Sequence, residues 1–344
     1  MKHRDILDRI DNYKTTIHAI LGFTNFYRFD DAAKTFRSDV QVFQGRQFEP
    51  SAGRKLKPSG QQVAYVCPDF AILVSKKEAV VGEVKKSFPK DQQHWEDDFG
   101  QVKSYDDDLT GWPTENEKVA THDLVMLVDQ LRGVPVQEYY EVHKGELAYE
   151  RTFILVEFNR ADERQSYYHF RKCQGTGSLS DPRIDNRLKY GVKVPMEALV
   201  RSYSEIKLYD NEPPLPYMVF LIWEHVLLQR ASGTADFAKL RKNQKIEIDI
   251  KVAEIVDELN RGFSFRILHG ENCDRQPQIP KPEWVSRACE KLVAIKEAEW
   301  TDPTKVTIRC RFRRYDDVLA HFVEACSRGE TPGQMSLGFP SDDQ

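Results

Sequence analysis

Two acidic residues and one lysine in the first third of the chain have the types and spacing of a reaction centre. Asp69 follows Pro68 and precedes an apolar run, and Glu83-Val84-Lys85 ends a second apolar run fourteen residues later. Because alternate side chains of a strand share a face, Glu83 and Lys85 project together while Val84 points the other way. A strand, a tight turn and a returning strand would bring Asp69 beside Glu83. Two adjacent carboxylates make a site for a hard cation such as Mg²⁺ or Mn²⁺.

The chemistry that such a site supports is hydrolysis of a phosphodiester. This reaction needs charge neutralised on the phosphate, hydroxide formed from water near neutral pH and the leaving alkoxide stabilised. Because Mg²⁺ keeps several waters, Asp69, Glu83 and the backbone carbonyl of Val84 suffice as its protein ligands. Lys85 would then orient or polarise the attacking water. The structural alternative is that Asp69 caps a turn, while Glu83 and Lys85 form a solvated pair on an edge strand.

The elements that must position these residues follow from the apolar periodicity. Residues 62–88 have the pattern of successive strands, and a helix is expected from about residue 91 to 108. Continuous apolar runs at 124–128 and 153–158 predict strands buried on both faces, with an edge strand at 167–173. Two helices, at 4–21 and 29–43, are expected to open the chain. The fold class expected is therefore α/β, a mixed central sheet flanked by helices.

With these elements in place, the segment resembles the PD-(D/E)XK nuclease superfamily, the restriction-endonuclease-like phosphodiesterases. The resemblance covers residues 25–175, and it is carried by Pro68-Asp69, by Glu83-x-Lys85 and by Gln101-Val102-Lys103-Ser104-Tyr105. The last of these is similar to the Gln-x-x-x-Tyr helix element of the exonuclease-like branches. The resemblance implies metal binding by Asp69 and Glu83, a catalytic Lys85, and helix groups near the substrate at Gln101 and Tyr105. For Tyr105, simple packing stays an equally open alternative.

Members of this superfamily often take a further acidic ligand from the first core helix. Within the helix expected at 29–43, Asp39 lies at the margin of the apolar stripe formed by Phe36, Val40 and Phe43. Asp39 is therefore the candidate for this metal position. A solvated helix acid is the equally open alternative.

Basic residues near the centre are candidates for holding a nucleic-acid backbone by charge. They are Lys86, next to the Glu-x-Lys motif, and Arg54 and Lys55 in a stretch at 44–61 that is rich in Gly, Pro and Ser. A solubilising surface is an equally open interpretation of the same residues.

Beyond Pro213-Pro214-Leu215-Pro216 the pattern predicts a second, mainly helical domain. Helices are expected at 216–229, about 250–260 and 283–300, then a strand at 305–313 and a helix at 315–327. One face of that strand is apolar and the other is basic, including Arg309, Arg311 and Arg313. A helix, a turn and a basic strand resemble the recognition helix and wing of winged-helix proteins, which bind the major groove of DNA. Because acids are interspersed along the helix, a protein-interaction role stays open beside DNA binding.

Length and composition bound these hypotheses. The sequence predicts a nuclease-like domain at 1–212, a winged-helix-like domain at 213–328 and a flexible tail at 329–344. A net charge of −4 gives no global basic signature, so nucleic-acid contacts must come from local patches. The six cysteines include no Cys-x-x-Cys pair, which argues against a zinc knuckle or a disulfide framework. No signal peptide or membrane span is apparent, so a cytoplasmic protein is expected.

The function that these features predict is a Mg²⁺-dependent deoxyribonuclease targeted by a winged-helix-like module. Restriction, repair or antiviral defence is implied by the resemblance alone, and a homodimer is compatible with cutting both strands of a duplex. One alternative is a catalytically silent nuclease-fold protein that binds DNA or regulates another factor. Another is a sensor of a small molecule or nucleotide. The residues leave open DNA or RNA, duplex or single strand, and cutting at ends or internally.

Overall fold

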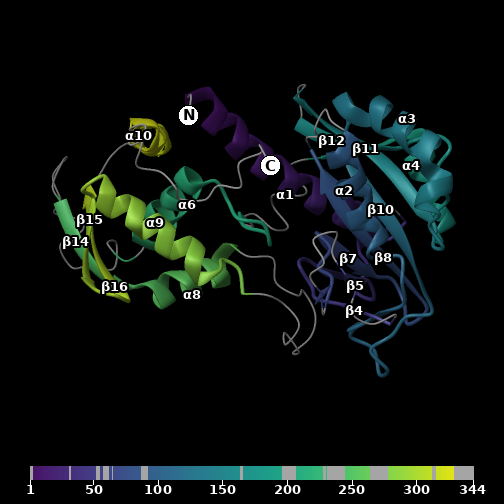
Figure 1. Ribbon diagram of the computed structural model, residues 1–344, viewed down its shortest axis with the longest axis horizontal. Helices are drawn as coiled ribbons and strands as arrows, with labels where there is room; N and C mark the ends of the chain where they lie inside the picture. The colour runs from purple at the N-terminus through teal and green to yellow at the C-terminus, as the bar shows by residue number, and fades with distance from the viewer. Residues whose placement is uncertain are drawn as a thin grey trace. The chain divides into compact units, whose positions relative to one another are not determined.

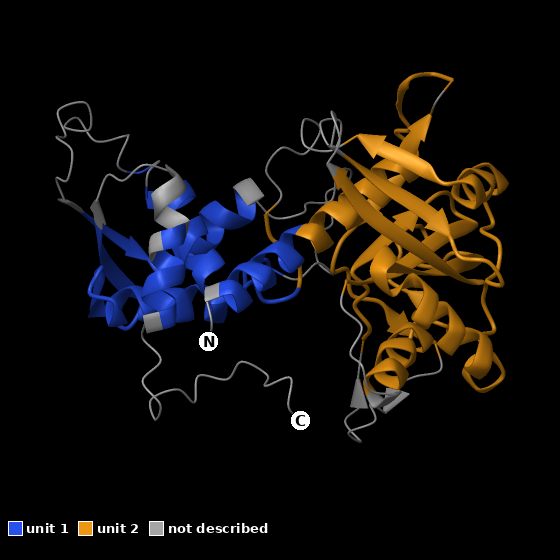
Figure 2. Ribbon diagram, turned by 90° about the horizontal axis from the view of Figure 1, so that it is seen from above, with its two compact units in different colours: residues 1–14, 211–264, 278–344 blue, residues 15–210, 265–277 orange. Residues whose placement is uncertain are grey.

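The computed structural model describes the chain at residues 3–30, 32–51, 55–56, 62–63, 65–86, 92–162, 166–195, 207–227, 230, 245–263, 278–311 and 315–328. These residues form two compact units, which Figure 2 colours separately. Unit 2 holds the described residues from 15 to 210, and unit 1 holds residues 3–14 together with the described residues from 211 onward. The tail expected at 329–344 lies outside the described residues. Among the described helices, none has the length and apolar character needed to cross a membrane.

A seven-stranded mixed sheet forms the centre of unit 2 (Figure 1). Its strand order is β13-β12-β11-β10-β8-β7-β3. The three inner strands β8, β10 and β11 are parallel, whereas the flanking strands pair antiparallel. The bounds are β3 (Gln41–Phe43), β7 (Phe70–Leu73), β8 (Glu78–Lys85), β10 (Thr121–Asp129), β11 (Phe153–Asp162), β12 (Ser166–Lys172) and β13 (Val192–Pro195). The expected α/β class is confirmed.

Helices cover both faces of this sheet. On one face lie α2 (Gln92–Lys103) and α3 (Gln130–Leu147), whose buried Phe99 and Val136 belong to the same core cluster as Val81 of β8. On the other face lies the unit 2 part of α1 (His3–Arg28), where the ring of Phe23 is 5.5 Å from that of Phe70. The helix α4 (Pro182–Tyr190) packs on β12. Because side chains alternate along β8, Glu83 and Lys85 share the α2 face with Val81.

Short ladders complete unit 2. They are β1 (Phe29–Asp30) with β2 (Thr35–Phe36), β4 (Glu49–Pro50) with β9 (Leu109–Thr110), and β5 (Lys55–Leu56) with β6 (Gln62–Val63).

Unit 1 is a set of helices on a three-stranded antiparallel sheet of order β14-β16-β15. In chain order its elements are α6 (Leu215–Leu221), the π-helical segment η1 (Ile222–Leu227), β14 (Lys245–Lys251), α8 (Val252–Phe263), α9 (Pro282–Ala294), β15 (Ala298–Asp302), β16 (Lys305–Arg311) and α10 (Tyr315–Arg328). The sequence predicted β16 and α10, but it missed β14. It assigned residues 298–300 of β15 to the end of a helix and residues 301–302 to a turn.

The helix expected at 29–43 is wrong. The segment instead turns back on itself, so that Phe29 of β1 pairs with Phe36 of β2. The side chain of Asp30 accepts hydrogen bonds from the backbone N–H groups of Ala32 and Ala33. Such a local side-chain bond offers the backbone an alternative to a helix, and Asp is well suited to it. Helical spacing of apolar residues therefore did not decide the structure here.

The edge strand expected at 167–173 is a strand, but it is not an edge. β13 pairs with it in antiparallel register along its outer side, from Tyr167 opposite Pro195 to Phe170 opposite Val192. The alternation of β13 spans only four residues and was not recognised in the sequence.

Gly82 is needed where β8 approaches the aromatic ring of Phe70. A Cβ atom at this position would lie 2.1 Å from the Cζ atom of Phe70. We therefore expect Gly82→Ala to lower the free energy of unfolding by about 1–3 kcal/mol, the usual cost of overpacking a core. Urea unfolding followed by circular dichroism measures this. Gly100→Ala on α2 is the control, since its Cβ would meet nothing within 4 Å, and equal losses in the two variants would contradict the argument.

Candidate active site

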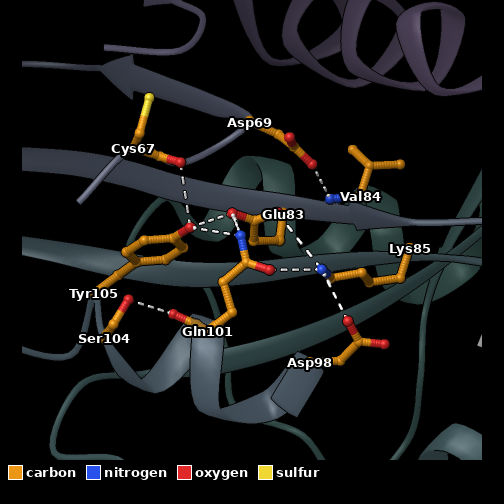
Figure 3. Close-up of polar contacts among 9 residues, drawn as sticks. All are labelled: Cys67, Asp69, Glu83, Val84, Lys85, Asp98, Gln101, Ser104 and Tyr105. Carbon is orange, nitrogen blue, oxygen red and sulfur yellow. Dashed lines mark hydrogen bonds and ion pairs between the residues drawn. The ribbon is translucent and has the colours of Figure 1, made fainter. Parts of the chain in front are cut away.

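The β7–β8 hairpin brings Asp69 and Glu83 together. Phe70, the first residue of β7, pairs with Gly82, so Asp69 and Glu83 are neighbours just beyond the last pair. Their side chains are almost completely buried, with 4% of Asp69 and 2% of Glu83 exposed. Figure 3 shows the two carboxyl groups at one end of the hairpin. The convergence expected from a fourteen-residue spacing is thus present.

Burial and mutual repulsion dominate the electrostatics of this carboxyl pair. Burial, together with the adjacent charge of Asp69, raises the pKa of Glu83 well above its usual value, although Lys85 opposes the shift. Burial also raises the pKa of Asp69, against the hydrogen bonds that it accepts from the Glu83 carboxyl and from the N–H of Val84. The bond from Val84 N to Asp69 Oδ2 is 2.8 Å long. Burial and the nearness of the second carboxyl group therefore both favour the protonated form of this pair.

Side chains from one face of α2 form hydrogen bonds with Glu83 and Lys85. Gln101 Nε2 donates to Glu83 Oε1 at 2.8 Å, and Gln101 Oε1 accepts from Lys85 Nζ at 2.7 Å, so a single amide bridges the carboxyl group and the ammonium. The hydroxyl of Tyr105 donates to the same Glu83 Oε1. Tyr105 also receives a bond of 3.3 Å from Gln101 Nε2. In the sequence these two residues were paired by their resemblance to a Gln-x-x-x-Tyr helix element, and Figure 3 shows both side chains directed at Glu83.

Asp98 is a site residue that the sequence analysis missed. Its Oδ1 atom lies 2.9 Å from Lys85 Nζ, and the side chains of Lys85 and Asp98 are 16% and 19% exposed. Burial alone would lower the pKa of Lys85, but the charges of Glu83, Asp98 and Asp69 outweigh it and raise that pKa. Asp98 precedes Gln101 by one helical turn, so its position on the face of α2 that carries Gln101 and Tyr105 was the available signal.

These donors suit a hard divalent cation in part. A strand residue directs its N–H and C=O groups to the same side, so the carbonyl of Val84 lies on the side of Asp69, which its N–H contacts. Two carboxylates and one carbonyl are oxygen ligands of the kind that Mg²⁺ and Mn²⁺ bind. In the part of the chain that the structure describes, no group of three His, Cys, Asp or Glu side chains could hold a metal ion. A cation here would complete its shell with water.

Asp39 does not join the site. It lies in a turn rather than on a helix, and its Oδ2 atom pairs with Arg37 at 2.8 Å while its side chain is 64% exposed. β3 begins at Gln41, which pairs with Leu73 at the end of β7 opposite to Asp69, so Asp39 precedes β3 beyond the far end of this strand pair. The stretch 15–28 of α1 contains no Asp or Glu that could replace it.

The basic residues expected at a nucleic-acid surface fall into three groups. Lys86 donates from Nζ to Thr15 Oγ1 of α1 at 3.2 Å. Arg309 on β16 lies between two carboxylates, 3.4 Å from Glu247 and 2.5 Å from Glu299. The side chains of Arg54, Lys55, Arg311 and Arg313 lie outside the described residues.

Comparison of the chain with family models, with curated proteins and with solved structures finds no match. The functional argument therefore depends on the geometry of this site.

The raised pKa of Glu83 predicts how pH changes the stability of the protein without metal. The folded chain holds the proton of this group more tightly than the unfolded chain, which ionises from about pH 4. The free energy of unfolding should therefore fall as pH rises from about 4 through the raised pKa. In Glu83→Gln, which cannot ionise, the fall should be smaller.

Urea unfolding in EDTA at several pH values between 5 and 8 measures this difference. Glu78→Gln, five residues earlier on β8, is the matched control and should keep the wild-type slope. Parallel pH profiles for wild type and Glu83→Gln would show that Glu83 is not buried beside a second acid.

Proposed function

We propose that the chain is a metal-dependent nuclease that hydrolyses phosphodiester bonds, with DNA as its substrate and Asp69, Glu83 and Lys85 as its reaction centre. The observation that carries the proposal is the burial of two adjacent carboxyl groups at a sheet end, with the ammonium of Lys85 4.0 Å from Glu83. Two buried carboxyl groups that repel each other need a proton or a cation between them, and a divalent ion can take the place of a proton.

Each residue of the centre has a chemical task in this proposal. A bound Mg²⁺ or Mn²⁺ would neutralise phosphate charge and lower the pKa of a coordinated water. Asp69, Glu83 and the carbonyl of Val84 would hold the ion, while Lys85 orients the attacking water or stabilises the charge that develops on the phosphate. Gln101 fixes the spacing between Glu83 and Lys85, because its amide bonds to both. Tyr105 fixes the position of Glu83 Oε1 through its hydroxyl hydrogen bond.

The topology supports the finer assignment to a restriction-endonuclease-like core. A helix, an antiparallel hairpin that carries Asp69 and Glu83, a helix that carries Gln101, and a parallel strand follow each other as α1, β7–β8, α2 and β10. The Pro-Asp, Glu-x-Lys and Gln-x-x-x-Tyr motifs on which the resemblance to the PD-(D/E)XK superfamily depends lie on or next to these elements in the same order. The chain departs from the family pattern at the first acidic position, since Asp39 is distant from the site.

The order of elements in unit 1 supports a winged-helix-like domain, for which protein binding is a second candidate role beside DNA binding. Its order of helix, strand, two helices and two strands, with β16 central in the sheet, is that of a helix-turn-helix variant followed by a wing. The two basic side chains of β16 that the structure describes are, however, paired with acids: Lys305 pairs with Asp249 at 2.8 Å, and Arg309 pairs with two glutamates. This observation favours contact with a protein over contact with the DNA backbone.

Lys85→Ala tests the nuclease directly. Linear, circular and single-stranded DNA are incubated with the protein in Mg²⁺, Mn²⁺ or EDTA, and cleavage is followed on gels. Wild type should cut only with a divalent ion, and Lys85→Ala should lose about 10²-fold or more of the rate while it keeps its DNA affinity. Lys77→Ala, exposed in the β7–β8 turn, is the control. A wild type that binds DNA but cuts none of these substrates would instead support a catalytically silent, regulatory protein.

Arg309→Ala tests the role of the wing. Because its guanidinium already contacts Glu247 and Glu299, we expect DNA affinity within about twofold of wild type and an unchanged dependence on salt, whereas loss of a phosphate contact reduces the log–log salt slope by about 1. Fluorescence anisotropy over a range of salt concentrations gives both quantities. A slope reduced by that amount would assign Arg309 to the DNA contact after all.

A further inference from the structure

The ammonium of Lys85 has three acidic or amide oxygens within reach, and they do not hold it equally. Gln101 Oε1 and Asp98 Oδ1, one turn apart on α2, accept from it at 2.7 and 2.9 Å. Glu83 Oε2 is 4.0 Å away, too far for a hydrogen bond. The ammonium is therefore held on the helix side of the site, as Figure 3 shows.

Without this hold, the nearest alternative for Lys85 is Glu83. The two side chains leave the same face of β8 two residues apart, and Gln101 and Tyr105 both bind Glu83 at Oε1 rather than at Oε2. The lysine side chain is flexible, and a buried ammonium forms an ion pair with a carboxylate within its reach because an unpaired buried charge is costly. Direct pairing with Oε2 would place a fixed positive charge on an oxygen that a divalent cation needs.

The geometry points to Asp98 as a positioning residue that holds Lys85 away from Glu83, and so keeps the Asp69–Glu83 pair available to a divalent cation. This inference deepens the proposed function and rests on it for the identity of the ligand. Asp98 itself touches neither substrate nor cation. Its effect passes through Lys85, so it should disappear when Lys85 is absent.

A double-mutant cycle on metal binding tests the dependence on Lys85. Isothermal titration with Mn²⁺ compares wild type, Asp98→Asn, Lys85→Met and the double variant, with Asp97→Asn as the control because Asp97 is the exposed neighbour of Asp98 on α2. Asp98→Asn should weaken Mn²⁺ binding about tenfold, as changes around ligating residues commonly do. In the Lys85→Met background the same change should weaken Mn²⁺ binding by no more than about twofold, because only the long-range attraction of the Asp98 charge is then lost. Equal losses in both backgrounds would overturn the inference, because a structural role acts regardless of Lys85.

A structure of Asp98→Asn without metal tests the geometry by itself. We expect Lys85 Nζ within hydrogen-bond distance of Glu83 Oε2, in place of the 4.0 Å separation in the wild type. An ammonium that stays on Gln101 at the original separation would show that Asp98 is not what holds it. This result depends neither on nuclease activity nor on metal binding. A wild type that binds no Mn²⁺ would refute the proposed function, and the crystal structure of Asp98→Asn would still decide whether Asp98 positions Lys85.

Discussion

The burial of Asp69 beside Glu83 is the interaction on which the rest of the site depends. Two carboxyl groups with almost no exposed surface cannot both ionise at low cost, so the pair needs a proton or a cation. The surrounding protein supplies part of the compensation: the N–H of Val84 donates to Asp69, Gln101 and Tyr105 donate to Glu83, and the ammonium of Lys85 lies 4.0 Å from Glu83. A structural core would have no reason to keep such a pair. Its presence at the end of a hairpin is the physical basis of the proposed reaction centre.

The β7–β8 hairpin and α2 together position the side chains of the site. The register of β7 and β8 sets the distance between the two acids, and the absence of a Cβ at Gly82 leaves room for the ring of Phe70. The helix then contributes Asp98, Gln101 and Tyr105 from one face. His122 of β10 supports the end of α2 through a bond of 2.8 Å between its Nε2 atom and the carbonyl of Tyr105. Burial lowers the pKa of His122 to about 4, so this imidazole is a neutral donor at pH 7.

Local alternation and spacing were enough to predict the centre, because a strand and a hairpin place side chains by short-range geometry. Glu83 and Lys85 share a face for that reason, whereas Gln101 and Tyr105 were predicted from the resemblance to a Gln-x-x-x-Tyr helix element. Long-range competition explains the failures. Asp30 turns the chain at a segment with helical apolar spacing, and this removes Asp39 from the site. The basic alternation of β16 was visible in sequence, but the pairing of Lys305 and Arg309 with acids was not. Glu247 and Asp249 come from β14, a strand that the sequence did not predict and that is distant along the chain, and Glu299 comes from β15, where a helix was expected.

Anomalous scattering from crystals grown with Mn²⁺ tests the central claim most directly. The account predicts one strong peak at about 2.0–2.6 Å from oxygen atoms of both Asp69 and Glu83, with the carbonyl of Val84 at similar distance and with water in the remaining positions. Absence of that peak at millimolar Mn²⁺, with the two carboxyl groups still hydrogen-bonded to each other, would contradict the account. The acidic pair would then be a protonated structural contact rather than a cation site.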